Sequence, residues 1–163
     1  MLFRSVFGSD FAHPMLRLAQ QKYLEAGPQK YIEADALKLP FADASFDLVT
    51  AAFGFRNLAN YEAGLREIVR VLRPGGEAGI LEFTEPQSSL IGSIYRFYLR
   101  QIVPRVGGAI SGSHAAYAYL PESVSKFPSA EELAWLMTQC GFAEARFELR
   151  TMGTVALHFG RRT

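Results

Sequence analysis

The fold of this chain is decided by residues 46–83, which read FDLVTAAFGFRNLANYEAGLREIVRVLRPGGEAGILEF. Residues 46–53 are almost continuously apolar, which is typical of a strand buried on both faces of a parallel sheet. Asn60 is a suitable N-cap for the next helix, whose apolar residues recur at helical spacing. Pro74-Gly75-Gly76 then ends that helix, and residues 78–83 form another apolar run. The stretch therefore predicts a strand, a crossover helix and a second, parallel strand.

The flanking sequence continues this alternation of strands and helices. Upstream, it predicts a strand over residues 2–8, a helix from Pro14 to Gly27 and a strand over residues 30–34. Downstream, it predicts a helix from Ser129, with a capping box, to Gly141, and then strands over residues 143–149 and 154–159. The last two strands are joined by a turn near Gly153, which is short enough for an antiparallel hairpin. The expected fold is α/β, with the Rossmann-like, seven-stranded sheet of class I methyltransferases that use S-adenosylmethionine.

Composition excludes several classes of protein. The 163 residues, 49% of them hydrophobic, suffice for one domain with its own core, and the net charge of +1 argues against a nucleic-acid partner. Cys140 is the single cysteine, so no intrachain disulfide is possible. His13, His114 and His158 are widely spaced and predict no metal site. No apolar run reaches the ~18 to 20 residues of a membrane span, so we expect a soluble, cytoplasmic protein.

Residues 86–128 differ in composition from the rest of the chain. They are rich in aromatic residues and carry several arginines against the single acid Glu122 between Pro86 and Pro128. The segment is too apolar for a solvated tether, so we interpret it as an insertion that covers a site. Tyr117 and Tyr119 suit an aromatic ligand, although ordinary core packing accounts for each of them equally well. His114 is a candidate acid or base.

Two acidic residues follow predicted strands upstream. Asp10 can accept the two hydroxyl groups of a ribose, or it can simply cap the helix that begins near Pro14. Asp35 can accept the exocyclic amine of an adenine, with the backbone around Ala36 against the ring. The alternative for Asp35 is a solvated turn. The sequence leaves both pairs of interpretations open.

Arg56 and Asn57 follow the strand at residues 46–53, at the end where parallel sheets bind ligands. Arg56 is a permanent cation that can hold an anionic oxygen or orient a water molecule. The alternative is a salt bridge to Glu82 or Glu85, which flank the end of the next strand.

Seven stretches of the chain resemble one family of enzymes. They are GSDFAHPML (8–16), ADALKLPF (34–41), SFDLVTAAFGFRN (45–57), RVLRPGG (70–76), ILEFT (80–84), YLPESV (119–124) and ALHFG (156–160). Together they resemble the ubiquinone/menaquinone biosynthesis C-methyltransferase family over nearly the whole chain. FGFRN, LEFT and YLPES are its specific motifs, and the others occur in many methyltransferases.

The resemblance implies S-adenosylmethionine as cofactor and methylation of a ring carbon in a prenylated quinol, either demethylmenaquinol or a benzoquinol analogue. The cofactor positions that it implies are Asp10 for the ribose, Asp35 and Ala36 for the adenine, and Ala52 along the cofactor. Arg56 and Asn57 would face the reacting centre, with His114 as a weaker candidate for the proton acceptor. The candidate substrate contacts are Tyr117, Tyr119 and Ser123.

One feature departs from the family pattern. The family has an earlier strand, at the centre of its sheet, followed by a glycine-rich loop, and no such GxG motif follows a strand in these residues. We therefore expect residues 1–163 to be a single methyltransferase domain that is incomplete at its N-terminus and lacks the first strand. Such a chain should bind S-adenosylmethionine weakly, fail to turn over, and self-associate through its open strand edges. The apolar, basic insertion is also expected to contact a membrane surface peripherally.

Three other functions are compatible with parts of the sequence. One is a methyltransferase that acts on another lipid or small molecule, which a methyl-transfer assay with quinol and non-quinol acceptors would distinguish. Another is a non-catalytic remnant, favoured by the absent glycine loop and opposed by the retained Arg56-Asn57 pair. A nicotinamide-dependent dehydrogenase is disfavoured by the absence of GxGxxG.

Overall fold

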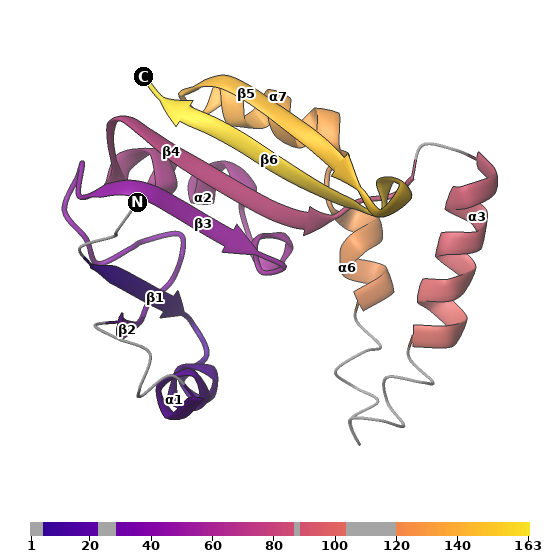
Figure 1. The fold of residues 1–163 in the computed structure, drawn as a ribbon, viewed down its shortest axis with the longest axis horizontal. Helices are drawn as coiled ribbons and strands as arrows, with labels where there is room; N and C mark the ends of the chain where they lie inside the picture. Colours follow the sequence, from indigo (N-terminus) through magenta and orange to yellow (C-terminus); the bar gives the residue numbers. More distant parts are fainter. Residues whose placement is uncertain (1–4, 23–28, 87–88, 104–119) are drawn as a thin grey trace.

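A computed structural model describes residues 5–22, 29–86, 89–103 and 120–163 of the chain (Figure 1). Its elements, in chain order, are β1 (Val6–Asp10), α1 (His13–Lys22), β2 (Gln29–Glu33), β3 (Phe46–Ala52), η1 (Phe55–Asn57), α2 (Tyr61–Val71), β4 (Leu72–Phe83), α3 (Ser89–Phe97), η2 (Tyr98–Ile102), α6 (Leu120–Lys126), α7 (Ala130–Gln139), β5 (Phe142–Arg150), η3 (Thr151–Gly153) and β6 (Val155–Arg162). Strands and helices alternate along the chain, so the predicted α/β class is confirmed.

The strands of the described residues form two separate sheets. β1 and β2 pair in parallel, and the second sheet has the order β3-β4-β6-β5. β3 and β4 are parallel, whereas β6 is antiparallel to both β4 and β5, which confirms the predicted terminal hairpin. In the part of the chain that the structure describes, no strand pairs with β1 and β3 to join the sheets, and Figure 1 shows them apart.

The unit β3-α2-β4 follows the sequence closely at its start and differs at its end. The Asn60 side chain caps α2 by accepting a hydrogen bond from the Ala63 N–H at 3.0 Å. The helix ends at Val71, and β4 begins immediately at Leu72 rather than at the predicted Ala78. The residues of the proline-glycine turn therefore lie within the strand, and the register between β3 and β4 shifts near its beginning.

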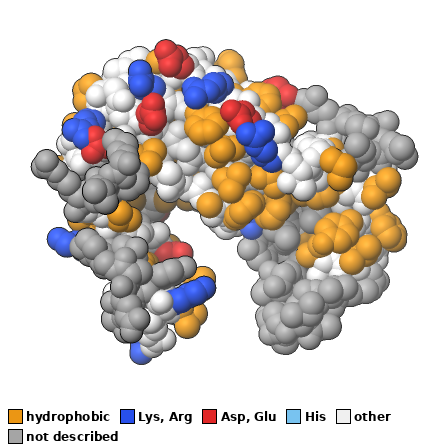
Figure 2. Space-filling model, in the orientation of Figure 1, with side chains coloured by type: hydrophobic (Ala, Val, Ile, Leu, Met, Phe, Trp, Pro, Cys, Tyr) orange, Lys and Arg blue, Asp and Glu red, His pale blue; other side chains and the backbone are white. Residues whose placement is uncertain are grey.

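The hydrophobic core lies on one face of the four-stranded sheet. Helices α2 and α7 cover this face in Figure 1, and the buried residues there include Leu65, Ile68, Ile80, Leu133 and Phe142. The side chains of alternate β4 residues are directed into this core because successive strand residues point to opposite faces. The other face carries partly exposed apolar side chains, which gather over the middle of the molecule in Figure 2.

Helices α3 and α6 lie beyond the ends of β3 and β4, as Figure 1 shows. α3 continues into the π-helical turn η2, so the predicted helical stripe is present in this segment. Its apolar side chains are nevertheless largely exposed: Ile94 and Phe97 each keep 62% of their surface, and Tyr98 and Ile102 are exposed as well. The described part of the predicted insertion thus presents apolar surface beside the carboxyl ends of the strands.

Candidate functional site

The candidate residues converge on one edge of the fold because the strands that carry them run in parallel. Asp10 is the last residue of β1, Asp35 follows β2, and Arg56 and Asn57 lie in η1 just after β3. The chain crosses from strand to helix at each of these points, and ligands of open α/β sheets bind along this edge.

Asp10 and Asp35 are held close to each other by the backbone. The Ala34 N–H donates to the Asp10 carbonyl oxygen at 3.1 Å, which joins the ends of β1 and β2. Each carboxylate also accepts one local backbone hydrogen bond at 2.8 Å, Asp10 from Ala12 N–H and Asp35 from Leu37 N–H. Only one oxygen of each carboxylate makes such a bond, so both local alternatives from the sequence are realised without excluding a ligand.

Arg56 is buried and forms an ion pair with Glu82. Arg56 retains 7% of its exposed surface and Glu82 none. The Arg56 Nη1 atom lies 3.1 Å from Glu82 Oε2 and 3.3 Å from Oε1, and the Arg56 backbone N–H donates to Oε1 at 3.2 Å. The sequence had left a choice between a ligand contact and a salt bridge, and in this structure the salt bridge to Glu82 is present.

The turn from β3 into η1 is fixed by several contacts around this pair. Phe53 adopts a left-handed backbone conformation with φ 56°, and its carbonyl oxygen accepts a hydrogen bond from the Arg56 guanidinium. The Phe83 ring centroid lies 5.5 Å from the guanidinium carbon of Arg56, which suits a cation-π contact. Tyr61 donates its hydroxyl to the Arg56 carbonyl oxygen at 3.2 Å, and burial followed by the Glu82 charge raises the pKa of Tyr61.

The remaining predicted residues are only partly accessible to this description. The Asn57 side chain is exposed at the edge, and Ala52 is exposed at the end of β3. Ser123 lies on α6, which contacts η1. His114, Tyr117 and Tyr119 lie outside the described residues.

One polar residue near Arg56 was missed by sequence reasoning. Tyr95 lies on α3, and its hydroxyl oxygen is buried without a hydrogen-bond partner among the described residues. Burial and the Glu85 charge raise the pKa of Tyr95 to about 12, and the Arg56 charge opposes this shift. No sequence pattern indicated this residue, because its burial depends on how α3 packs against the strand ends.

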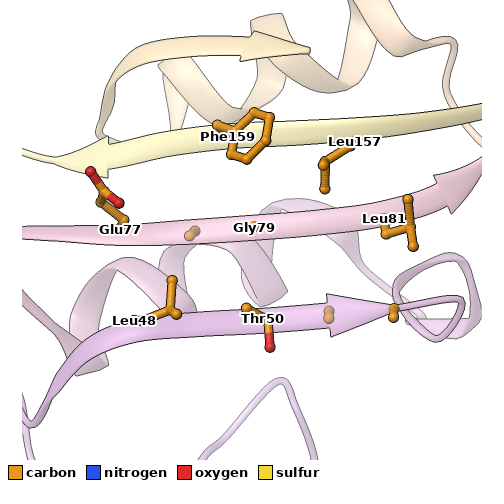
Figure 3. Close-up of a pocket in the computed structure, with 10 residues that line it drawn as sticks. Leu48, Thr50, Glu77, Gly79, Leu81, Leu157 and Phe159 are labelled. Atoms are coloured by element: carbon orange, nitrogen blue, oxygen red, sulfur yellow. The ribbon is translucent and has the colours of Figure 1, made fainter. Parts of the chain in front are cut away.

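The open face of the sheet carries a shallow apolar depression. Figure 3 shows Leu48, Thr50, Leu81, Leu157 and Phe159 along it, contributed by β3, β4 and β6. Ala52 lines the same depression, which places the predicted cofactor-lining residue at its carboxyl end.

Two searches of the described residues give negative results. They contain no group of three or more histidine, cysteine or acidic side chains arranged to hold a metal ion. No helix in the described ranges is long and apolar enough to cross a membrane.

Residues 3–162 match the sequence profile of the ubiE/COQ5 methyltransferase family. The chain belongs to this family. It is 50% identical over 158 residues to a demethylmenaquinone methyltransferase of Thermus thermophilus, an alignment that covers 96% of this chain and 71% of that protein. It is 40% identical over 161 residues to the ubiquinone/menaquinone biosynthesis C-methyltransferase UbiE of Geobacter sulfurreducens, with 97% and 62% covered. The chain thus spans about two thirds of the length of these ubiE/COQ5 relatives.

A solved structure supports the fold. A SAM-dependent methyltransferase from Aquifex aeolicus superposes with a TM-score of 0.67 at 17% sequence identity, covering 98% of this chain and 69% of that one. At this identity the likeness concerns the fold alone, and it confirms the predicted class I methyltransferase architecture. The ubiE/COQ5 profile confirms the family inferred from the sequence motifs, and with it the enzyme class and cofactor of that family.

Proposed function

We propose that this protein takes part in the S-adenosylmethionine-dependent C-methylation of a prenylated quinol, with demethylmenaquinol as the favoured substrate. The observation that carries this proposal is the carboxyl edge of the strands, where two acidic residues stand beside a buried arginine-glutamate pair. The names of the relatives in the same family support the choice of substrate.

The edge fits the adenosine part of the cofactor. Asp10 and Asp35 keep a second carboxylate oxygen beyond the one that accepts a local backbone N–H, and both residues follow adjacent parallel strands. A carboxylate can accept hydrogen bonds from ribose hydroxyls or from an exocyclic amine. Asp10 would hold the ribose, Asp35 and Ala36 the adenine, and Ala52 would line the cofactor.

When bound, S-adenosylmethionine supplies an electrophilic methyl group on a sulfonium. A quinol becomes a carbon nucleophile once a ring hydroxyl loses its proton: the ring carbon gives an electron pair to the methyl carbon, sulfur keeps the electrons of the broken bond, and the carbon then releases its hydrogen as a proton. Arg56 cannot be the base at neutral pH because its pKa is above ~12. We assign it to stabilising the negative oxygen of the quinolate, with Asn57 beside it.

Residues 86–128 are proposed to cover the quinol ring, with Ser123, Tyr117 and Tyr119 as substrate contacts and His114 as the proton acceptor. The exposed apolar residues of α3 support a role in admitting the prenyl tail and in peripheral membrane contact. The edge of β3, which pairs only with β4 among the described strands, supports self-association.

The test of cofactor binding is the substitution Asp10→Asn. Asparagine keeps a carbonyl oxygen for the Ala12 N–H but removes the charge, so α1 should start as before. We expect S-adenosylmethionine affinity to fall about tenfold or more, the effect of losing hydrogen bonds to a charged group. Glu62→Gln on α2, where the side chain is 51% exposed, is the matched control and should leave affinity unchanged.

The assay uses calorimetry for S-adenosylmethionine and transfer of a labelled methyl group to short-chain demethylmenaquinol. It is run on the 163-residue chain and on the same chain preceded by the upstream part of the Thermus relative. Because β1 and β3 are unpaired to each other, we expect tight binding and turnover in the extended form and weak binding in the shorter one. Normal affinity in Asp10→Asn would make Asp10 a helix cap only. Transfer to a non-quinol acceptor, with none to the quinol, would contradict the substrate assignment.

A further inference from the structure

Two buried hydrogen-bond donors near the ends of β3 and β4 have no acceptor among the described residues. They are the Nε atom of Arg56 and the hydroxyl of Tyr95. Buried polar atoms in folded proteins are nearly always hydrogen-bonded, and leaving one unpaired is costly. Two such atoms beside a candidate active site therefore need a functional explanation.

The geometry of the ion pair explains why the Arg56 Nε–H is left over. Glu82 is engaged by Nη1 and by backbone N–H groups of Arg56 and Phe83, the latter at 3.1 Å. The Phe53 carbonyl oxygen also accepts from Nη1. A guanidinium has five N–H bonds in a rigid plane, so fixing Nη1 fixes the direction of Nε–H as well. The pair with Glu82 thus orients a donor that it does not itself use.

Tyr95 brings a second donor to the same region from a different element. Its hydroxyl is protonated at neutral pH because burial and the Glu85 charge raise the pKa of Tyr95 to about 12. The Arg56 charge acts in the opposite direction on the same hydroxyl, so the two side chains interact electrostatically. Tyr95 is therefore a neutral hydrogen-bond donor next to a fixed cation, and it is not a base.

We propose that the Tyr95 hydroxyl and the Arg56 Nε–H together bind one ring oxygen of the substrate, the oxygen that carries negative charge in the quinolate. This inference rests on the proposed function and adds Tyr95 as a substrate-contacting residue. An anionic phenolic oxygen has lone pairs for both donors, and a charged donor with a neutral one in a buried place stabilises such an oxygen strongly. The two donors would also select the ring position next to that oxygen for methylation.

The inference is tested with Tyr95→Phe and its matched control Tyr98→Phe on the 163-residue chain. Tyr98 lies three residues further along and is 48% exposed, whereas the Tyr95 hydroxyl is buried. The probe is menadiol, a methylated naphthoquinol without a tail, kept reduced under nitrogen and titrated by calorimetry. We expect Tyr95→Phe to weaken menadiol binding about tenfold or more, and Tyr98→Phe to leave it unchanged.

A second measurement separates this role from a structural one. The Tyr95 hydroxyl has no partner to lose among the described residues, so Tyr95→Phe should not lower the urea midpoint of the ligand-free chain. A lowered midpoint would mean that the hydroxyl stabilises the fold and would contradict the inference. Equal menadiol affinity in Tyr95→Phe and the unmodified chain would also overturn it, as would an unmodified chain that binds no menadiol. If menadiol binding depends on Tyr95 but the extended form methylates no quinol, the donor site stands and the proposed function is wrong.

Discussion

Replacing Glu82 with glutamine should destabilise the protein far more than the same change at an exposed position of the same strand. Glu82 has no exposed surface and accepts four hydrogen bonds, three of them from Arg56. In Glu82→Gln the Arg56 cation remains buried without its counter-charge, and an amide N–H group faces it. Breaking a buried pair in this way costs about 3 to 5 kcal/mol, a large part of the ~5 to 15 kcal/mol stability of a typical domain.

The control is Glu77→Gln, five positions earlier on β4. Glu77 pairs with Arg161 at 3.3 Å, and both side chains are more than half exposed. Such surface pairs contribute only ~0 to 1 kcal/mol. With a urea m-value of ~2 kcal/mol/M, the midpoint of unfolding should fall by about 1.5 to 2.5 M for Glu82→Gln and by less than ~0.5 M for Glu77→Gln.

A double variant identifies the cause of the loss. Adding Arg56→Met to Glu82→Gln removes the stranded cation, while the glutamine carbonyl can still accept from the backbone N–H groups that Glu82 serves. The double variant should recover more than half of the lost midpoint. Equal shifts for Glu82→Gln and Glu77→Gln would refute the reasoning, as would a double variant less stable than Glu82→Gln alone.

Two further predictions concern the core and β4. Burial lowers the pKa of His158 below its ordinary value near 6.5, so the unfolded chain binds a proton that the folded chain does not; stability should be complete above that pH and fall as pH decreases, and His158→Gln should flatten this loss in urea titrations between pH 7 and 5. Gly76→Ala should lower the unfolding free energy by about 1 to 3 kcal/mol, because a Cβ there meets three backbone carbonyl oxygens at 2.9 to 3.2 Å. Gly79→Ala, whose Cβ meets only a methyl group at 3.8 Å, is its control, and equal effects by circular dichroism would sink the steric argument.

Most of the fold could be predicted from local patterns, and the errors lie where pairing extends beyond them. The apolar runs and the helical stripe located β3, α2 and the final hairpin. β4 begins at Leu72 rather than Ala78 because a strand can keep its partner through the glycine-rich stretch, which residue type alone does not reveal. The upstream strand was predicted over residues 2–8, whereas β1 runs from Val6 to Asp10 and includes the candidate acid.

The candidate site was predictable to different depths for different residues. Strand parity alone could have chosen between the alternatives for Arg56: Ala78, Ile80 and Glu82 alternate along β4 on the core face, so Glu82 had to be buried and needed a cation. Tyr95 could not be found this way, because the burial of its hydroxyl depends on how α3 sits against a distant part of the chain.

The antiparallel pairing of β4 with β6 has a consequence for the order of folding. Phe83 pairs with Val155, so this ladder closes a loop of about 70 residues, whereas β5 and β6 meet across a short turn between Arg150 and Val155. The entropy of closing a loop grows only logarithmically with its length, at about 0.6 kcal/mol for each doubling. The hairpin can therefore form early as a local unit, and β4 joins it in a slower, long-range step. Lengthening or shortening residues 86–128 should change the rate of that step while leaving the stability of the finished sheet almost unaltered, so the part of the chain assigned to the substrate is also the part whose length is freest to change.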